Sequence, residues 1–131
     1  MSDAQTLARR WLDALHVLDI DAAVELLADD AVLEIPLAPP GLADRFEGKA
    51  AIAAFLGASQ VFAKLDFHDI EVRETTDPEV AVVEFRSTGT FKETDRDYAN
   101  RYVLIIRALS GQIVLYREYF NPLALAAAFG N

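Results

Sequence analysis

The chain has 131 residues, 53% of them hydrophobic, and its 21 acidic and 12 basic residues give a formal net charge of −9 at pH 7. This length suits one hydrophobic core, and the negative charge repels phosphate backbones and anionic lipids, which argues against a nucleic-acid partner. Without cysteine, and with only His16 and His68, disulfides, thiol nucleophiles and thiolate metal sites are excluded.

Two helices are predicted at the start of the chain. Ser2 and Gln5 have capping-box spacing, and the first helix should run to about Leu18. Its apolar stripe recurs at helical intervals, at Leu7, Trp11, Leu15 and Leu18. A second short helix should be capped by Asp19 or Asp21 and close at residues 29–30.

A short strand and a third helix should follow. Ala31, Leu33 and Ile35 alternate with Val32 and Glu34 before Pro36, which predicts a short strand. Residues 36–41 should form a stiff Pro-rich loop. Past Gly48, residues 49–63 carry Ile52, Phe55 and Leu56 at helical spacing, which predicts the third helix.

The rest of the chain reads as four long strands and a terminal helix. The predicted strands cover residues 65–75, 80–91, 97–108 and 112–120, with turns at residues 76–79 and 110–111. Asn121 and Pro122 are a good N-cap and first helical residue, so residues 123–129 should form a short helix.

This order predicts the fold class α+β and a single domain spanning residues 1–131. Three N-terminal helices should pack on one face of a strongly curved, mainly antiparallel sheet, followed by the short C-terminal helix. Long strands that bend around a helix layer need bulges, and the resulting cone has an interior suited to a small ligand.

Neither end of the chain resembles a targeting segment. Residues 1–3 carry no basic stretch followed by an apolar run, and the apolar residues 123–129 are too few to span a bilayer. We therefore expect a cytoplasmic protein without a membrane partner.

Side chains alternate along each strand, and one face of the last strand carries Tyr116, Glu118 and Phe120. If that face lies inside, the Glu118 carboxyl group loses water and its pKa rises toward the range useful for proton transfer. The alternative is a surface Glu118 paired with Arg101 or Arg107, because alternation alone does not say which face is inside.

Asn100 and Tyr102 share an apolar face of the preceding strand and could hold a carbonyl or hydroxyl oxygen of a ligand. Each candidate pocket residue also has a purely structural interpretation. The Tyr102 hydroxyl could bind a backbone group, Trp11 could be an ordinary residue of the hydrophobic core, and His68 could form its hydrogen bonds with a neighbouring residue. The acidic clusters at residues 29–30 and 93–97 lack metal-ligand spacing, so no metal site and no cofactor are predicted.

Residues 27–36 (LADDAVLEIP) and 111–122 (GQIVLYREYFNP) resemble the nuclear-transport-factor-two-like superfamily. Within it, the chain is most similar to SnoaL-like (polyketide cyclase-like) and ketosteroid isomerase-related proteins. The resemblance covers nearly the whole chain and implies a cone fold, while the superfamily hosts enzymes and non-catalytic binders alike.

The resemblance also indicates which catalytic residues of related enzymes are absent from this chain. Where ketosteroid isomerase has a Tyr, an Asp base and a second oxyanion acid, this chain has Trp11, Ile35 and Val103. Residues 116–121 align with the catalytic stretch of the limonene epoxide hydrolases, which implies that Glu118 faces the pocket. The companion Arg and Asp of those hydrolases are replaced by Phe85 and Ser87, and their Tyr and Asn fall at about Leu33 and Ile35. Neither known mechanism is therefore expected.

The resemblance to SnoaL-type cyclases implies a cofactor-free isomerase or cyclase in which Glu118 moves a proton at a carbon beside a carbonyl group, with Asn100 and Tyr102 holding the oxygen. The alternative is a non-catalytic binding module of the same fold. The expected partners are a small apolar or aromatic metabolite and a second copy of the chain, joined through the outer sheet face. The expected pocket lining is Trp11, Leu15, Leu33, Ile35, Phe55, His68, Phe85, Ser87, Leu104, Tyr116 and Phe120.

Overall fold

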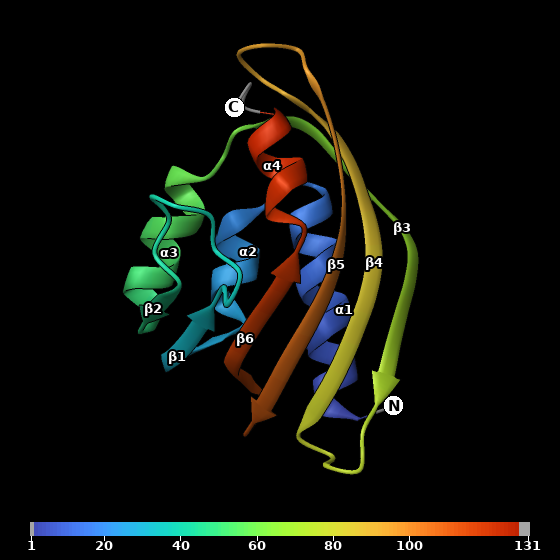
Figure 1. Ribbon diagram of the computed structural model, residues 1–131. Helices are drawn as coiled ribbons and strands as arrows, with labels where there is room; N and C mark the ends of the chain where they lie inside the picture. Colours follow the sequence, from blue (N-terminus) through green and yellow to red (C-terminus); the bar gives the residue numbers. More distant parts are fainter. Residues whose placement is uncertain (1, 129–131) are drawn as a thin grey trace.

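The computed structural model describes residues 2–128, and within them the helices and strands follow one another in an α+β arrangement (Figure 1). The elements are α1 (Asp3–His16), α2 (Ile20–Glu25), β1 (Leu27–Glu34), β2 (Arg45–Glu47), α3 (Lys49–Ala58), β3 (Phe62–Glu74), β4 (Val80–Phe91), β5 (Asp97–Leu109), β6 (Gln112–Phe120) and α4 (Pro122–Ala128). The strands form one sheet in the order β2-β1-β6-β5-β4-β3. All neighbours are antiparallel except β1 and β6, which are parallel.

The predicted caps of the first two helices are confirmed. The Ser2 hydroxyl accepts the backbone N–H of Gln5 at 3.2 Å, and the Gln5 side chain accepts the backbone N–H of Ser2 at 2.9 Å, which completes the capping box. Helix α1 ends at His16, before the predicted Leu18, because Leu18 has the left-handed backbone angle φ 60°. Asp19 caps α2 by accepting the backbone N–H of Ala22 at 3.0 Å.

The boundary between α2 and the sheet was predicted wrongly. Helix α2 ends at Glu25, and Leu27, which the predicted helix end at residues 29–30 would include, already pairs with Ile113 of β6. The predicted strand at residues 31–35 is therefore the second half of β1. Sheet pairing across the whole molecule overrides the local helical pattern here.

Two further boundaries differ from the prediction. Helix α3 ends at Ala58 and not at residue 63, because Phe62 joins the sheet opposite Phe91. Strand β2 was not predicted, since a three-residue strand at a sheet edge leaves too short a pattern to recognise. Asn121 accepts the backbone N–H of Leu123 at 3.0 Å, as expected of the cap of α4, and Phe129 lies outside the described residues.

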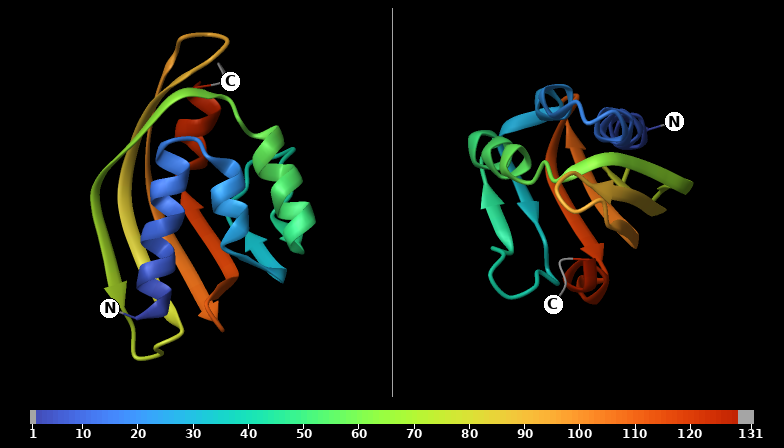
Figure 2. Two further views of the ribbon diagram at one scale, coloured as in Figure 1. Left: turned by 180° about the vertical axis from the view of Figure 1, so that it is seen from behind. Right: turned by 90° about the horizontal axis from the view of Figure 1, so that it is seen from above.

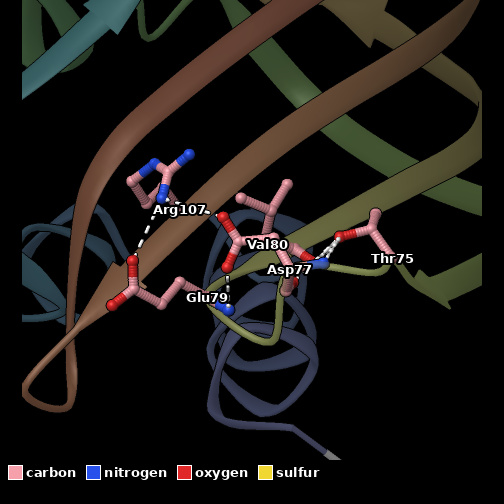
Figure 3. A network of polar contacts seen from close by, with 5 residues as sticks. All are labelled: Thr75, Asp77, Glu79, Val80 and Arg107. Atoms are coloured by element: carbon pink, nitrogen blue, oxygen red, sulfur yellow. Dashed lines mark hydrogen bonds and ion pairs between the residues drawn. The ribbon is translucent and has the colours of Figure 1, made fainter.

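The four-strand meander is confirmed, and β4 and β6 have the predicted bounds. Figure 3 shows how the turn between β3 and β4 is fastened to β5. Arg107 donates to Asp77 at 3.2 Å and to Glu79 at 3.0 Å. Within the turn, the Thr75 hydroxyl accepts the backbone N–H of Asp77 at 3.2 Å and lies 2.9 Å from the carbonyl oxygen of Val80. These contacts hold the end of the hairpin against its neighbour.

The sheet is strongly bent, and its bends coincide with irregular pairing. The β3–β4 register shifts between His68 and Glu71, where Asp69 has a φ of 55°, and the β5–β6 register shifts after Arg107. Such bulges increase local twist and bend a strand. Figure 2 shows α1, α2 and α3 lying over one face of the bent sheet, which is the inner face.

The core lies between these helices and the inner face. Its fully buried side chains include Trp11, Leu33, Val83, Leu104 and Ile106. On β4 and β5 nearly every second side chain is buried in this core or borders it, and on β6 the buried side chains are Ile113, Tyr116 and Phe120. No helix within the described part of the chain is long and apolar enough to cross a membrane.

Leu27→Ala should lower the free energy of unfolding by about 2–5 kcal/mol, because Leu27 is fully buried and its truncation leaves a cavity. Leu109→Ala is the matched control, since Leu109 also lies on a strand but is 51% exposed, and it should change stability by less than about 1 kcal/mol. Urea unfolding followed by the fluorescence of the single, buried Trp11 measures both values. Equal effects would contradict this packing.

Candidate active site

Glu118 lies on the inner face of β6, as the resemblance implied. It stands opposite Leu104 of β5, which is fully buried, and between Tyr116 and Phe120, which are 3% and 9% exposed. The Glu118 residue itself is only half-buried. The carboxyl group therefore lies among side chains that are closed to solvent.

The electrostatic surroundings make Glu118 unusual among the acids of the chain. Burial raises the pKa of the Glu118 carboxyl group to about 7, and the neighbouring Tyr116 hydroxyl acts in the opposite direction. At neutral pH both the carboxylate and the carboxylic acid are therefore populated. A group in this condition can take a proton from one atom and return it to another.

Three tyrosine hydroxyls surround this carboxyl group. Burial is the main reason that the pKa values of Tyr98, Tyr102 and Tyr116 lie above the usual range of phenols, and the negative charge of Glu118 raises all three further. These hydroxyls therefore stay protonated at every pH at which Glu118 changes charge. The hydroxyl of Tyr102 can act as a hydrogen-bond donor to an oxygen atom brought into the site.

Trp11 brings a further donor from α1. Its ring packs against Tyr116 with the ring centres 4.7 Å apart, and it is fully buried. The hydroxyl of Ser87 has no hydrogen-bond partner within the described residues. The indole N–H of Trp11 has none with full hydrogen-bond geometry there, and it interacts with the Tyr116 hydroxyl, whose pKa it lowers. Buried polar atoms without partners cost free energy, so a ligand or water oxygen at the Trp11 N–H would be stabilising.

Asn100 is placed on the inner face of β5, and its amide is fully engaged by the protein. Both Nδ2 hydrogens are used, one toward the Tyr98 hydroxyl at 2.7 Å and one toward the carbonyl oxygen of Asn121 at 3.0 Å. Its Oδ1 accepts the backbone N–H groups of Arg101 at 2.8 Å and Asn121 at 3.0 Å. The amide therefore has no spare hydrogen for a ligand oxygen.

Most of the expected lining residues lie in or against the inner core. The Phe85 ring stacks on Tyr102 with centres 5.0 Å apart, and the Phe55 ring stacks on Phe46 of β2 with centres 4.3 Å apart. Leu15 is partly buried and packs against the core. The remaining expected lining residues are buried: Leu33, Ile35, Ser87, Leu104, Tyr116 and Phe120.

His68 is the exception and corrects the expected lining. It stands opposite Arg86 of β4, whose side chain points outward, and its Nε2 lies 2.7 Å from the hydroxyl of Thr88 on the same outer face. Strand alternation before the bulge sends Phe67 inward and His68 outward. His68 therefore belongs to the outer face and is satisfied by a neighbour, the alternative left open by the sequence.

Tyr98 is the site residue that the sequence analysis left out. Its hydroxyl lies 2.6 Å from that of Tyr102, and it is 3% exposed. It stands two residues before Asn100 on the same face of the strand, so alternation could have found it.

A hollow of about 520 Å³ is present on the opposite, outer face of the sheet. Charged, outward-facing side chains of β3, β4 and β5 surround it, and three residues whose side chains face inward, Phe85, Tyr102 and Phe120, also border it. Its lining is Asp69, Glu71, Glu84, Phe85, Arg86, Arg101, Tyr102, Val103, Tyr119 and Phe120. No group of three or more His, Cys, Asp or Glu side chains suited to a metal ion occurs in residues 2–128.

Comparison with known proteins gives concordant results. The family model of the SnoaL-like domain matches residues 8–116, a stretch that ends just before Glu118. An uncharacterised PhzA/B-like protein of Pseudomonas aeruginosa is 35% identical over 124 residues, covering 95% of this chain and 79% of the relative. The uncharacterised protein YesE of Bacillus subtilis is 34% identical over 124 residues, covering 94% and 84% of the two chains.

Solved structures agree with these matches. A presumed isomerase from Bacillus subtilis superimposes with a TM-score of 0.90 at 33% identity, over 98% of this chain and 93% of that one. A presumed polyketide cyclase from Xanthomonas campestris superimposes with a TM-score of 0.81 at 22% identity, over 96% of each chain, which shows a common fold.

The free energy of unfolding of Glu118→Gln should exceed that of the wild type by an amount that grows as the pH rises. A carboxyl group whose pKa is raised on folding destabilises the folded state once it ionises, so the effect is absent near pH 4 and complete above pH 7. The variant should therefore match the wild type near pH 4 and exceed it by up to about 3 kcal/mol near pH 8.5. Urea unfolding at the two pH values measures this, and a pH-independent difference would contradict a buried Glu118.

Proposed function

This chain belongs to the SnoaL-like domain family, and we propose that it is a cofactor-free acid–base enzyme acting on a small, largely apolar carbonyl compound. In the proposed reaction, the Glu118 carboxylate removes a proton from a carbon beside the carbonyl group. The carboxylic acid so formed returns the proton at another carbon of the substrate, or the carbanion attacks a second carbonyl carbon of the same molecule. In the latter case the π bond of that carbonyl opens to an alkoxide, which takes the proton back from the Glu118 carboxylic acid. The first course is an isomerisation and the second a cyclisation.

The observation that carries the proposal is the pKa of about 7 on a half-buried carboxyl group at the inner face. A general base works best when its pKa lies near the working pH, because it is then both sufficiently ionised and sufficiently basic. An acid sealed inside the core could not meet a substrate, and a solvated one would be too weak a base. Glu118 avoids both extremes.

Proton removal beside a carbonyl group places negative charge on its oxygen, and this charge must be stabilised. The indole N–H of Trp11 and the hydroxyl of Tyr102 are the donors proposed for this role. The buried apolar side chains around them, such as Leu104 and Phe120, keep water away. Hydrogen bonds to the oxygen are stronger when the site excludes water.

The site suits uncharged substrates better than carboxylates. The described residues of the inner core that are fully or nearly buried include no Lys or Arg, and the buried polar ones are Ser87 and Asn100. A substrate carboxylate would therefore meet the charge of Glu118 without a cation to balance it. This favours neutral ketones and related carbonyl compounds.

Glu118→Gln should reduce proton exchange at the carbon beside the carbonyl of small cyclic and aromatic ketones by at least about 100-fold, because the amide cannot act as a base. Incubation in deuterated water followed by proton NMR measures the exchange. In the wild type the rate should rise with pH and level off above about 7, as Glu118 becomes ionised.

Glu84→Gln is the matched control for this experiment. Glu84 lies on the outer face of β4, where its carboxylate pairs with Arg73, so its loss should leave the exchange rate unchanged. A wild type that exchanges no faster than buffer with any ketone would contradict the enzyme proposal. If Glu118→Gln then leaves ligand affinity intact, the protein is instead a binding module.

We also propose that the outer sheet face joins two copies of the chain. Val103, 37% exposed, lies on that face beside the half-buried Ile105, and Val103 lines the outer hollow. Apolar side chains at the centre of an exposed sheet face are expected where another surface covers them.

Val103→Asp should convert a dimer into a monomer, because it places an uncompensated charge in the covered surface. Leu109→Asp is the control on the same strand, since Leu109 is exposed at the hairpin end and away from the hollow. Light scattering after size-exclusion chromatography measures the mass, and a monomeric wild type would contradict this assembly.

A further inference from the structure

Three polar side chains on the inner face of β5 form a continuous hydrogen-bonded chain. Asn100 Nδ2 lies 2.7 Å from the Tyr98 hydroxyl, and the Tyr98 hydroxyl lies 2.6 Å from that of Tyr102. Each of the three stands two residues from the next, so strand alternation brings all of them to one face. The direction in which the hydrogens point along this chain decides what Tyr102 can do.

The orientation of the Asn100 amide is fixed by the backbone. Its Oδ1 faces the N–H groups of Arg101 and Asn121, at 2.8 Å and 3.0 Å, and backbone N–H groups can only donate. The oxygen must therefore be on that side, and the NH₂ group must be on the other. It follows that Asn100 donates to the Tyr98 hydroxyl.

Tyr98 in turn must donate to Tyr102. The Tyr98 residue is 3% exposed and its hydroxyl accepts from Asn100, so its own hydrogen needs an acceptor. The Tyr102 oxygen is the acceptor that the described residues supply. The reverse direction would leave the buried Tyr98 hydrogen unpaired, which costs about 1–3 kcal/mol.

This direction leaves the hydrogen of the Tyr102 hydroxyl without a partner inside the described protein. The ring is held by Phe85 and Phe120, whose centres lie 5.0 Å and 5.8 Å away, so the hydroxyl cannot swing to another place. Unlike Tyr98, Tyr102 is only half-buried. Its hydrogen is therefore left for an acceptor that the described residues do not supply.

We propose that Tyr98 and Asn100 are positioning residues that direct the Tyr102 hydroxyl hydrogen toward the carbonyl oxygen of the bound substrate. The inference rests on the proposed function for the identity of that oxygen. Each bond in such a chain polarises the next, so Tyr102 is a stronger donor than an isolated phenol. Burial raises the pKa of Tyr102, which keeps it protonated for this task.

The test uses acetophenone labelled with ¹³C at its carbonyl carbon, whose NMR resonance reports the hydrogen bond to its oxygen. Tyr102→Phe should move the bound resonance upfield and weaken binding by about tenfold, the value of one hydrogen bond. Tyr98→Phe keeps the ring and the Tyr102 hydroxyl, yet it should move the resonance part of the way in the same direction. Tyr119→Phe, which removes a hydroxyl from a residue that lines the outer hollow, should leave it unmoved.

Asn100→Asp provides a second test that does not remove Tyr98. A carboxylate in that position accepts the Tyr98 hydrogen, which reverses the chain and makes Tyr102 donate to Tyr98. The bound resonance should then match that of Tyr102→Phe. Urea unfolding of each variant establishes that it is folded before the comparison is made.

We call the directed hydrogen bonds from Asn100 through Tyr98 to Tyr102 the relay. These measurements test the relay separately from the proposed proton transfer by Glu118. The shifts should persist in a Glu118→Gln background, where no proton is transferred. Shifts that depend on Tyr98 without any proton exchange in the wild type would support the relay and contradict the enzyme. A probe that does not bind, or a bound resonance identical in the wild type and Tyr98→Phe, would overturn the relay.

Discussion

An antiparallel sheet sends alternate side chains to opposite faces, and α1 covers only one face of β4, β5 and β6. This constraint governs the rest of the molecule. It places Glu118 among buried apolar and phenolic side chains, while its neighbours Arg117 and Tyr119 face outward. The loss of water around one carboxyl group then sets its pKa, and the pKa sets the chemistry that the site can perform.

The polar groups of the inner site are one carboxyl group and several hydrogen-bond donors. One acid is accompanied by protonated phenols and by an indole N–H that has no partner with full hydrogen-bond geometry among the described residues. Such a set is costly to bury unless an oxygen atom of a ligand completes it. The same donors become more favourable as negative charge develops on that oxygen, which links the unsatisfied interior to catalysis. The fold keeps this cost tolerable through the extensive apolar core around it.

Local patterns predicted the elements well where the signal was short-range. The capping box of Ser2 and Gln5 and the bounds of β4 and β6 depend on neighbouring residues or on strict alternation, and they are confirmed. Predictions failed where distant strands compete for the chain. Leu27 has helical spacing, yet pairing with Ile113 in the sheet draws it into β1.

The sequence by itself determined the α+β class, the two residue lists of each strand and the position of a carboxyl group between two aromatic residues. It could not decide which list lies inside, because alternation is the same for either choice. Only the packing of α1 against the sheet settled that question, turning Glu118 inward and His68 outward. Likewise, the direction of the chain from Asn100 through Tyr98 required backbone donors on Asn121, which the fold alone brings beside β5.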